Sequence, residues 1–344
     1  MPGQAKILVL RFSAMGDVAM TAPVLRELQE QNPGCELIVV SRALFEPFFE
    51  GIPRLKFHPI EPKGKHKGFF GLLRLFNELR SYRITAVADL HQNLRSRTIS
   101  SLFRFAGVKV ETLNKGRSEK KQLTRKENKF LKPLKPMPER YADIFRALGL
   151  KLQLQHKLIP NPESLLGPVL ALTGDKKSTD RWIGIAPFAQ HLQKVYPLEK
   201  MEWIVNQLAE KGYKLWIFGG GQKEQKIAEQ WEQVHKNSCS LVCKLSLKEE
   251  LNLVSNLDLM LSMDSAGMHM ASLKGIPVVS IWGATHPFAG FLGYGQELKN
   301  CVQLDLACRP CSVYGNKACY RGDFACMNTL SEVETLKIIT DTLS

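Results

Sequence analysis

Short apolar runs alternate with amphipathic segments along most of this chain, and this alternation predicts an α/β fold. A first apolar run, 6–11, precedes a polar turn, a segment of helical spacing at 18–31 and a second apolar run at 36–41. Residues 85–90 and 95–106 repeat the order of strand and helix. Such alternation indicates parallel sheets covered by helices.

The same pattern starts again in the second half of the sequence. Predicted strands lie at 182–187, 213–218, 257–262 and 277–282, and predicted helices at 198–211, 222–235, 247–255 and 265–274. Two successive doubly wound units predict two facing Rossmann-like domains with a cleft between them. Ligands of such sheets bind beyond the carboxyl ends of the strands, so the strand-to-helix turns are where function is expected.

Prolines place the boundary between the two expected domains. The stretch 158–179 contains Pro160, Pro162 and Pro168 and is interpreted as the linker, which gives domains at 1–165 and 166–344. The last helix could pack back on the first domain. Residues 115–140 are rich in lysine and proline and are interpreted as a loop within the first domain.

A net charge of +14 indicates a polyanionic partner. Nucleic acid, a phosphorylated substrate and the anionic inner face of a membrane all fit, as does a merely solvated surface. Residues 115–135 alone hold nine Lys or Arg against two Glu. No apolar stretch approaches the roughly 20 residues that span a bilayer, and the run 7–10 is too short for a signal peptide, so a cytoplasmic protein is expected.

The first strand-to-helix turn, residues 11–17, holds the first candidate for chemistry. Gly16 permits close backbone approach, and Asp17 opens the following helix either as a simple cap or as a functional carboxylate. One glycine does not make the dinucleotide-binding pattern, which argues against nicotinamide chemistry.

Three later turns could hold a phosphorylated ligand. The segment 264–269 puts small residues and His269 at a helix start, where free amides and the helix dipole suit a diphosphate. Lys194 lies in the loop after the strand 182–187 and is a natural phosphate partner. Glu224 follows a glycine run and could accept hydrogen bonds from ribose hydroxyls. Each of these residues could instead be structural or merely solvated, so the prediction of a ligand site rests on their combination.

Four cysteines near the end of the chain form a C-x2-C-x7-C-x6-C pattern. They are Cys308, Cys311, Cys319 and Cys326. The first pair has the spacing of a zinc knuckle, so a structural four-thiolate site is chemically possible. Free thiols and disulfides remain alternatives, with disulfides disfavoured in a reducing cytoplasm. No catalytic role or catalytic metal is expected.

Taken in order, these segments resemble glycosyltransferase family 9, the ADP-heptose:lipopolysaccharide heptosyltransferases. The resemblance is carried by Met15-Gly16-Asp17, Lys194, the segment 263–271 and the segment 276–287. It implies a fold of the glycosyltransferase-B type, with an acceptor-binding first domain and a nucleotide-sugar-binding second domain. The implied activity is an inverting, metal-independent transfer of heptose from ADP-heptose to inner-core lipopolysaccharide.

The resemblance also implies roles for individual residues. Asp17 would be the general base, and the donor would contact Ser13, Met15, Gly16, Lys194, Glu224, Asp264, Ser265, Gly267, Met268 and His269. No cofactor is implied besides the donor substrate. Candidates to contact the anionic acceptor are the basic residues Lys63, Lys65, Arg95, Arg97 and Arg140.

The implied partners are a nucleotide-sugar donor, the lipopolysaccharide inner core and the anionic cytoplasmic membrane surface, with no nucleic acid. The protein would then work at the inner face of the inner membrane. Two departures from the family pattern, Asp-Ser-Ala-Gly at 264–267 and Gly-Ala-Thr-His-Pro at 283–287, lie near the donor. They leave open a related transferase that uses another nucleotide-sugar for another surface glycan. The alternative of a different class is a polyanion-binding protein on a Rossmann scaffold.

Overall fold

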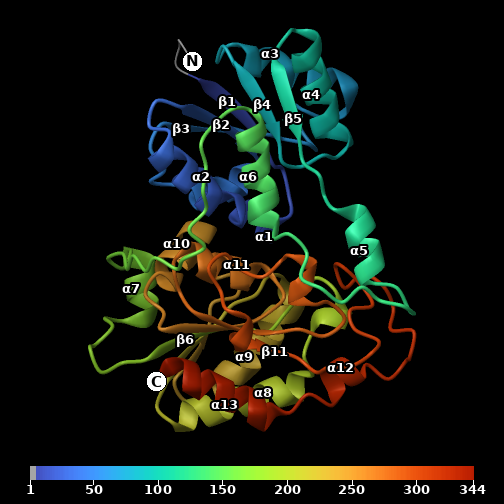
Figure 1. Cartoon of the computed structure of the whole chain (residues 1–344). Coiled ribbons are helices and arrows are strands. Elements are labelled where there is room, and N and C mark those ends of the chain that lie inside the picture. The colour runs from blue at the N-terminus through green and yellow to red at the C-terminus, as the bar shows by residue number, and fades with distance from the viewer. Residues whose placement is uncertain (1–4) are drawn as a thin grey trace. The chain divides into compact units, whose positions relative to one another are not determined.

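The computed structural model describes residues 5–344 and divides into two compact α/β units (Figure 1). The first consists of residues up to Lys115 together with Lys135–Gln155, and the second of Gly116–Leu134 and His156–Ser344. Each unit contains one parallel sheet covered by helices, which confirms the predicted fold class of two parallel α/β domains.

The first sheet contains five parallel strands in the order β3-β2-β1-β4-β5. The strands are β1 (Lys6–Leu10), β2 (Glu36–Ser41), β3 (Leu55–Pro59), β4 (Ala86–Asp89) and β5 (Lys109–Thr112). The chain builds outward from β1 to β3 and then crosses back to place β4 on the other side of β1. The carboxyl ends of β1 and β4 therefore form the topological switch point of this sheet.

Apolar faces of helices cover this sheet. The helices are α1 (Met15–Ala19), α2 (Thr21–Gln31), the 3-10 helix η1 (Ala43–Phe49), α3 (Gly68–Arg80), α4 (Leu94–Phe105) and α6 (Met137–Ala147). Leucines of α3 and Ile99 and Phe103 of α4 share one core with inward side chains of β1, β2 and β4. The single helix predicted at 18–31 is two helices. Pro23 lies in the first turn of α2, and its ring would clash with the carbonyl of Ala19 in a continuous helix.

The second sheet contains six parallel strands in the order β11-β10-β9-β6-β7-β8. The strands are β6 (Trp182–Ala186), β7 (Lys214–Ile217), β8 (Ser238–Ser240), β9 (Leu259–Met263), β10 (Val278–Ile281) and β11 (Cys301–Val302). Here the chain builds from β6 to β8 and then returns to β9 on the opposite side of β6. The switch point lies at the carboxyl ends of β6 and β9.

The second sheet has a hydrophobic core on each face. Its helices are α5 (Arg117–Leu123), α7 (Gly167–Thr173), α8 (Leu198–Glu210), α9 (Gln222–Val234), α10 (Leu247–Val254), α11 (Ala266–Leu273), α12 (Ala325–Asn328) and α13 (Glu332–Leu343), with short 3-10 helices η2 (Leu192–Lys194), η3 (Pro287–Ala289) and η4 (Leu298–Asn300). All strands and helices predicted for this half of the chain are present, with ends shifted by one or two residues.

The basic segment 116–134 differs from the expectation of a loop within the first domain. It contains α5 and belongs to the second unit. Leu123 and Leu134 bury against Ala289, and the Lys129 ammonium donates hydrogen bonds to the carbonyls of Cys308 (2.6 Å) and Pro310 (2.8 Å). Its lysines therefore serve partly as structural contacts, which composition alone does not reveal.

Two further expectations about domain organisation need correction. Residues after Gln155 already belong to the second unit. The backbone amide of His156 donates to Tyr294, and two amides of the stretch expected to be linker donate to Ser255 and Asn252 of that unit. The last helix, α13, was expected to be able to pack back on the first domain; it belongs to the second unit and packs on α8, β9 and β10 of that unit. Within residues 5–344, no helix combines the length and apolar character that crossing a membrane requires.

Candidate functional site

The switch point of the first unit holds a buried arginine paired with a partly exposed aspartate. Asp17 lies in the first turn of α1, directly after β1, and its carboxylate forms an ion pair with the Arg11 guanidinium. Arg11 is buried and also donates a 2.7 Å hydrogen bond to the carbonyl of Leu90, at the end of β4. The arginine therefore orients the carboxylate from the protein side, while the carboxylate remains accessible from solvent.

The neighbouring turn after β4 is fixed by a second aspartate that sequence reasoning missed. Asp89 is fully buried and accepts hydrogen bonds from the backbone amides of His91 and Gln92 and from the hydroxyls of Ser96 and Ser100. These bonds hold His91 so that its Nδ1 accepts a 3.0 Å hydrogen bond from the backbone amide of Phe12. The two turns are thus joined beside Asp17.

His91 is held neutral at this switch point. Burial, followed by the positive charges of Arg11 and Lys115, lowers its pKa to about 3. A neutral imidazole is also what its hydrogen bond requires, because Nδ1 must be an acceptor for the amide of Phe12. His91 therefore positions the turn after β1.

The switch point of the second unit holds a lysine–aspartate pair. Lys194, at the end of η2 in the loop after β6, places its ammonium 2.9 Å from the carboxylate of Asp264, which follows β9. Asp264 is buried and the Lys194 side chain is largely buried. The structure brings together these two residues from 70 positions apart, and the carboxylate of Asp264 holds the ammonium of Lys194 in place.

The start of α11 differs from the expectation for some of its residues. Ser265 is the N-cap and stays partly exposed, so the free amides of the first turn remain available to an anion. A Cβ at Gly267 would lie 2.6 Å from the Cβ of Ala186, so glycine is needed for the close packing of α11 on β6. Met268 is fully buried in the core. His269 is buried too. The side-chain positions of Gly267 and Met268 therefore face the protein, so a donor contact at these two residues would use their backbone amides.

Glu224 lies in the first turn of α9, after the glycine run that follows β7. Its carboxylate accepts a 2.7 Å hydrogen bond from the backbone amide of Gly220. This bond fixes the shape of the glycine turn at the edge of the second switch point. A ribose contact would have to use the remaining acceptor capacity of the carboxylate.

The basic residues expected to contact an acceptor fall into two groups. Lys63, Lys65, Arg95 and Arg97 are exposed, near the starts of α3 and α4. Arg140 is buried instead, and its guanidinium donates to the backbone carbonyls of Lys135 and Asn114. Burial and these two bonds give Arg140 structural contacts within the first unit.

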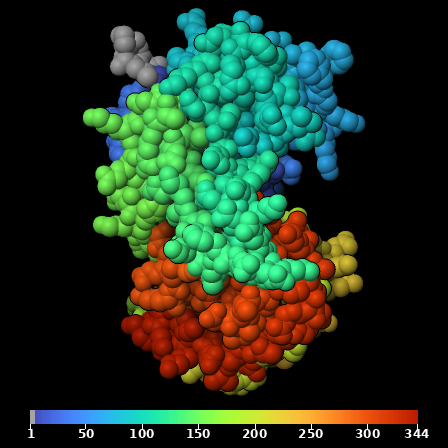
Figure 2. Space-filling model, turned by 45° about the vertical axis from the view of Figure 1, so that its right-hand side comes forward, coloured from blue at the N-terminus to red at the C-terminus, as the bar shows by residue number. Residues whose placement is uncertain are grey.

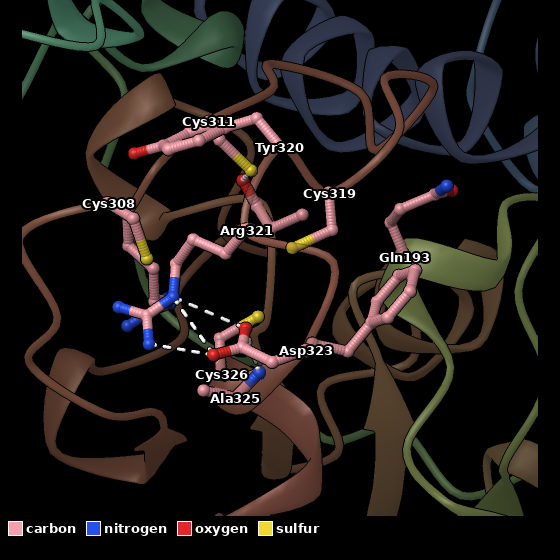
Figure 3. Close-up of a pocket in the computed structure, with 12 residues that line it drawn as sticks. Gln193, Cys308, Cys311, Cys319, Tyr320, Arg321, Asp323, Ala325 and Cys326 are labelled. Atoms are coloured by element: carbon pink, nitrogen blue, oxygen red, sulfur yellow. Dashed lines mark hydrogen bonds and ion pairs between the residues drawn. The ribbon is translucent and has the colours of Figure 1, made fainter.

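The four C-terminal cysteines line one pocket. In Figure 3 the thiols of Cys308, Cys311, Cys319 and Cys326 lie around the side chain of Arg321, which pairs with Asp323 at 2.7 Å. None forms a disulfide. In the part of the chain that the structure describes, no three His, Cys, Asp or Glu side chains are grouped so as to hold a metal ion. Burial raises the pKa of the Cys326 thiol to about 11.

The loop that carries these cysteines supports the second switch point. A Cβ at Gly315, whose φ is +77°, would lie 2.4 Å from the stem of Lys194, so the loop packs directly on this lysine. Arg309 is buried and donates to the carbonyls of Trp282, Gly283, Thr285 and Leu304 and to the side chain of Gln303. It thereby fixes the turn after β10. Neither role has a local sequence signal, because both depend on contacts with distant segments.

Two parallel α/β units, each with a charged pair at its switch point, have the architecture of a two-domain transferase of the Rossmann type. Residues 72–320 match the model of glycosyltransferase family 9 (heptosyltransferase), so the chain belongs to this family and is a glycosyltransferase. The resemblance carried by the turn motifs is confirmed.

Relatives of known identity span nearly the whole chain. Lipopolysaccharide heptosyltransferase 1 of Campylobacter coli is 24% identical over 367 residues, covering 98% of both chains. The structure of Escherichia coli ADP-heptose lipopolysaccharide heptosyltransferase II has a TM-score of 0.70 at 19% identity, covering 98% of each chain. That of Escherichia coli heptosyltransferase WaaC with ADP-2-deoxy-2-fluoro heptose has a TM-score of 0.63 at 16% identity, covering 98% of this chain and 100% of that one. These structures share the fold of this chain.

Proposed function

We propose that this protein transfers a heptose from ADP-heptose to an inner-core lipopolysaccharide acceptor, with inversion and with Asp17 as general base. The observation that carries the proposal is Asp17 at the switch point of the first unit, oriented by buried Arg11 and open to solvent. Relatives named as lipopolysaccharide heptosyltransferases support the acceptor class, and the Escherichia coli protein named for ADP-heptose supports the donor.

One base suffices for this reaction because the leaving group is already a stable anion. The Asp17 carboxylate accepts the proton of the acceptor hydroxyl while that oxygen attacks the anomeric carbon. The bond from the anomeric carbon to the diphosphate breaks at the same time, and its electron pair stays on ADP. A single in-line displacement inverts the anomeric configuration. Glycosidases, in contrast, need a second carboxyl group to protonate a sugar leaving group.

The second unit supplies positive charge where the diphosphate develops negative charge. Lys194 is held by Asp264 beside the free amides at the start of α11. Amides and an ammonium that are already in place stabilise the departing ADP without reorganisation. Ser265, partly exposed at the N-cap, is placed to hydrogen-bond a phosphate oxygen. Glu224 remains the candidate for the ribose.

The exposed cations of the first unit suit an acceptor that carries carboxylates and phosphates. Lys63, Lys65, Arg95 and Arg97 all lie at the carboxyl edge of the first sheet, the edge where Asp17 lies. Charges at that edge would attract the acceptor and hold it near the base. The protein would then act in the cytoplasm, where nucleotide-sugars are made.

The test is an assay of ADP release and product mass with purified protein, ADP-heptose and a deacylated inner-core acceptor. Acceptor-dependent ADP release, with a product heavier by one heptose and inverted at the anomeric carbon by NMR, is expected. UDP- and GDP-sugars serve as controls for the donor. Turnover with one of these and not with ADP-heptose would keep the transferase and overturn the donor. Retention of configuration would overturn the single displacement.

A further inference from the structure

The carboxyl edge of the first sheet presents large apolar side chains to solvent. Phe69 and Phe70, in the first turn of α3, are 61% and 84% exposed, and Leu94, at the start of α4, is 83% exposed. The inward face of α3 is satisfied by Leu72, Leu75 and Leu79 in the core, so the exposed phenylalanines are not needed for packing. We call residues 63–70 and 94–97 the rim surface.

Cations surround these apolar side chains. Residues 62–77 contain three lysines and one arginine, and residues 90–110 contain three arginines and one lysine, with no Asp or Glu in either stretch. Lys63, Lys65 and Lys67 of the rim surface are exposed, and so are Arg95 and Arg97. The Lys65 ammonium lies 3.7 Å from the carboxylate of Glu61 and 4.0 Å from that of Glu78, and the Lys65 side chain remains 39% exposed.

The lysine-bearing loop before α3 has a fixed shape. His66 is buried between the exposed lysines; its Nδ1 accepts a 3.0 Å hydrogen bond from the backbone amide of Glu61, and its Nε2 lies 3.2 Å from Glu78 of α3. These contacts tie the loop to the helix. Alternate side chains of the loop consequently point outward, and the lysines are presented together with Phe69 and Phe70.

The two parts of the rim surface lie on neighbouring helices. α3 and α4 pack side by side, with the rings of Phe76 and Phe103 in edge contact at 4.9 Å between centroids (Figure 1). Each helix leads into the next parallel strand, so both begin at the carboxyl edge of the sheet. In Figure 2 the light-blue to teal segments that include them adjoin one another on the surface of the first unit.

We propose that the rim surface docks the first unit on an anionic lipid bilayer. Phenylalanine and leucine would enter the headgroup region, while lysine and arginine side chains pair with lipid phosphates and keep their stems along the apolar boundary. Charge complementarity favours this partner over a protein, because the rim surface itself contains five cations and no acid, and the bordering Glu61 and Glu78 offset only part of this positive charge. Docking itself is independent of the donor and the base.

Docking has a consequence for catalysis that follows from the position of the rim surface and rests on the proposed function. The same edge of the sheet carries Asp17 at the end of β1. A glycolipid acceptor anchored in the bilayer would present its sugar headgroup near this edge. Docking would then raise the local concentration of acceptor at the base.

The test is cosedimentation of the full chain with vesicles of phosphatidylcholine containing phosphatidylglycerol, compared with phosphatidylcholine alone. Binding is expected only to the anionic vesicles and should weaken with salt. Phe69→Ala/Phe70→Ala should lower the partition coefficient by roughly a hundredfold, since burying each ring is worth about tenfold or more. Phe105→Ala removes an equally exposed phenylalanine, 90% exposed, from the opposite end of α4 and should leave binding unchanged.

A second pair of variants separates local from overall charge. Lys63→Ala/Lys65→Ala/Lys67→Ala should weaken binding by about fivefold per lysine at low salt. Lys211→Ala/Lys226→Ala/Lys236→Ala removes the same charge from exposed positions of the second unit and should have little effect.

Absence of binding by the unaltered protein, or equal binding by the rim and control variants, would overturn docking through this surface. Turnover of a deacylated, water-soluble acceptor by Phe69→Ala/Phe70→Ala should match that of the unaltered protein. If the unaltered protein binds anionic vesicles but does not turn over the soluble acceptor, the proposed function is refuted while docking through the rim surface stands.

Discussion

Arg11 lies beneath Asp17 and joins the ends of β1 and β4, so one buried side chain both orients the carboxylate and holds two turns together. In the second unit the buried carboxylate of Asp264 likewise orients the ammonium of Lys194. At both switch points a less exposed charge fixes the side chain that would meet the substrate. Removing the less exposed partner should therefore impair function without removing the reacting group.

His91 makes the first switch point sensitive to acid. Its pKa is lowered from 6.5 to about 3, so between these values the unfolded chain binds a proton that the folded chain excludes. Stability should therefore fall as pH drops from 6.5 toward 3, by up to about 5 kcal/mol from this group. His91→Gln should flatten the dependence of the free energy of unfolding on pH in this window. Identical slopes from urea unfolding of both proteins would contradict this role.

Gly267 tests whether the start of α11 depends on close packing. In Gly267→Ala the new methyl group would collide with Ala186, and the resulting overpacking should cost about 1–3 kcal/mol of stability and weaken ADP binding. Gly167→Ala, at the exposed start of α7, is the matched control, because its methyl group would meet nothing within 4 Å. Calorimetric titration with ADP should separate the two variants, and equal affinities would show that the packing of α11 does not matter for the donor.

Between the elements, Arg309 connects the cysteine loop to the turn after β10. Arg309→Lys loses the planar fork that reaches several carbonyls at once and leaves buried acceptors unsatisfied. A loss of about 2–3 kcal/mol in unfolding free energy is expected. Arg321→Lys, at an exposed ion pair with Asp323, should change it by less than about 1 kcal/mol. Comparable losses in both would contradict the assignment.

Most elements follow from the sequence because their signals are local. Strands β6, β7, β9 and β10 of the second half, and β2 in full, were predicted from apolar runs alone, whereas the short strands β8 and β11 were not predicted. β3 was not predicted, since Lys56 and His58 interrupt its apolar positions, and α3 begins with Gly68 and exposed aromatics that hide its helical period. The position of segment 116–134 depends on Lys129 reaching carbonyls about 180 residues away, which no local pattern records.

For the whole molecule, the sequence placed Asp17, Lys194 and Asp264 in turns that follow strands, and the strand order of the structure shows that these turns lie at the two switch points. What the sequence did not predict are the supporting residues. Phe12 and His91 are 79 positions apart, and Gly315 packs on Lys194 across more than a hundred. Such pairs become visible only once the sheet brings strand ends together, whereas a turn motif is complete within a few residues.

The role of Asp17 as general base is tested by comparing turnover and donor affinity in Asp17→Asn, which keeps the size of the side chain and removes the base. We expect kcat for heptose transfer to fall by at least a hundredfold, the usual contribution of a general base, while the affinity for ADP stays unchanged. Asp175→Asn, at an exposed position of the second unit, is the control and should keep full activity. Turnover retained by Asp17→Asn would contradict the assignment of Asp17 as general base.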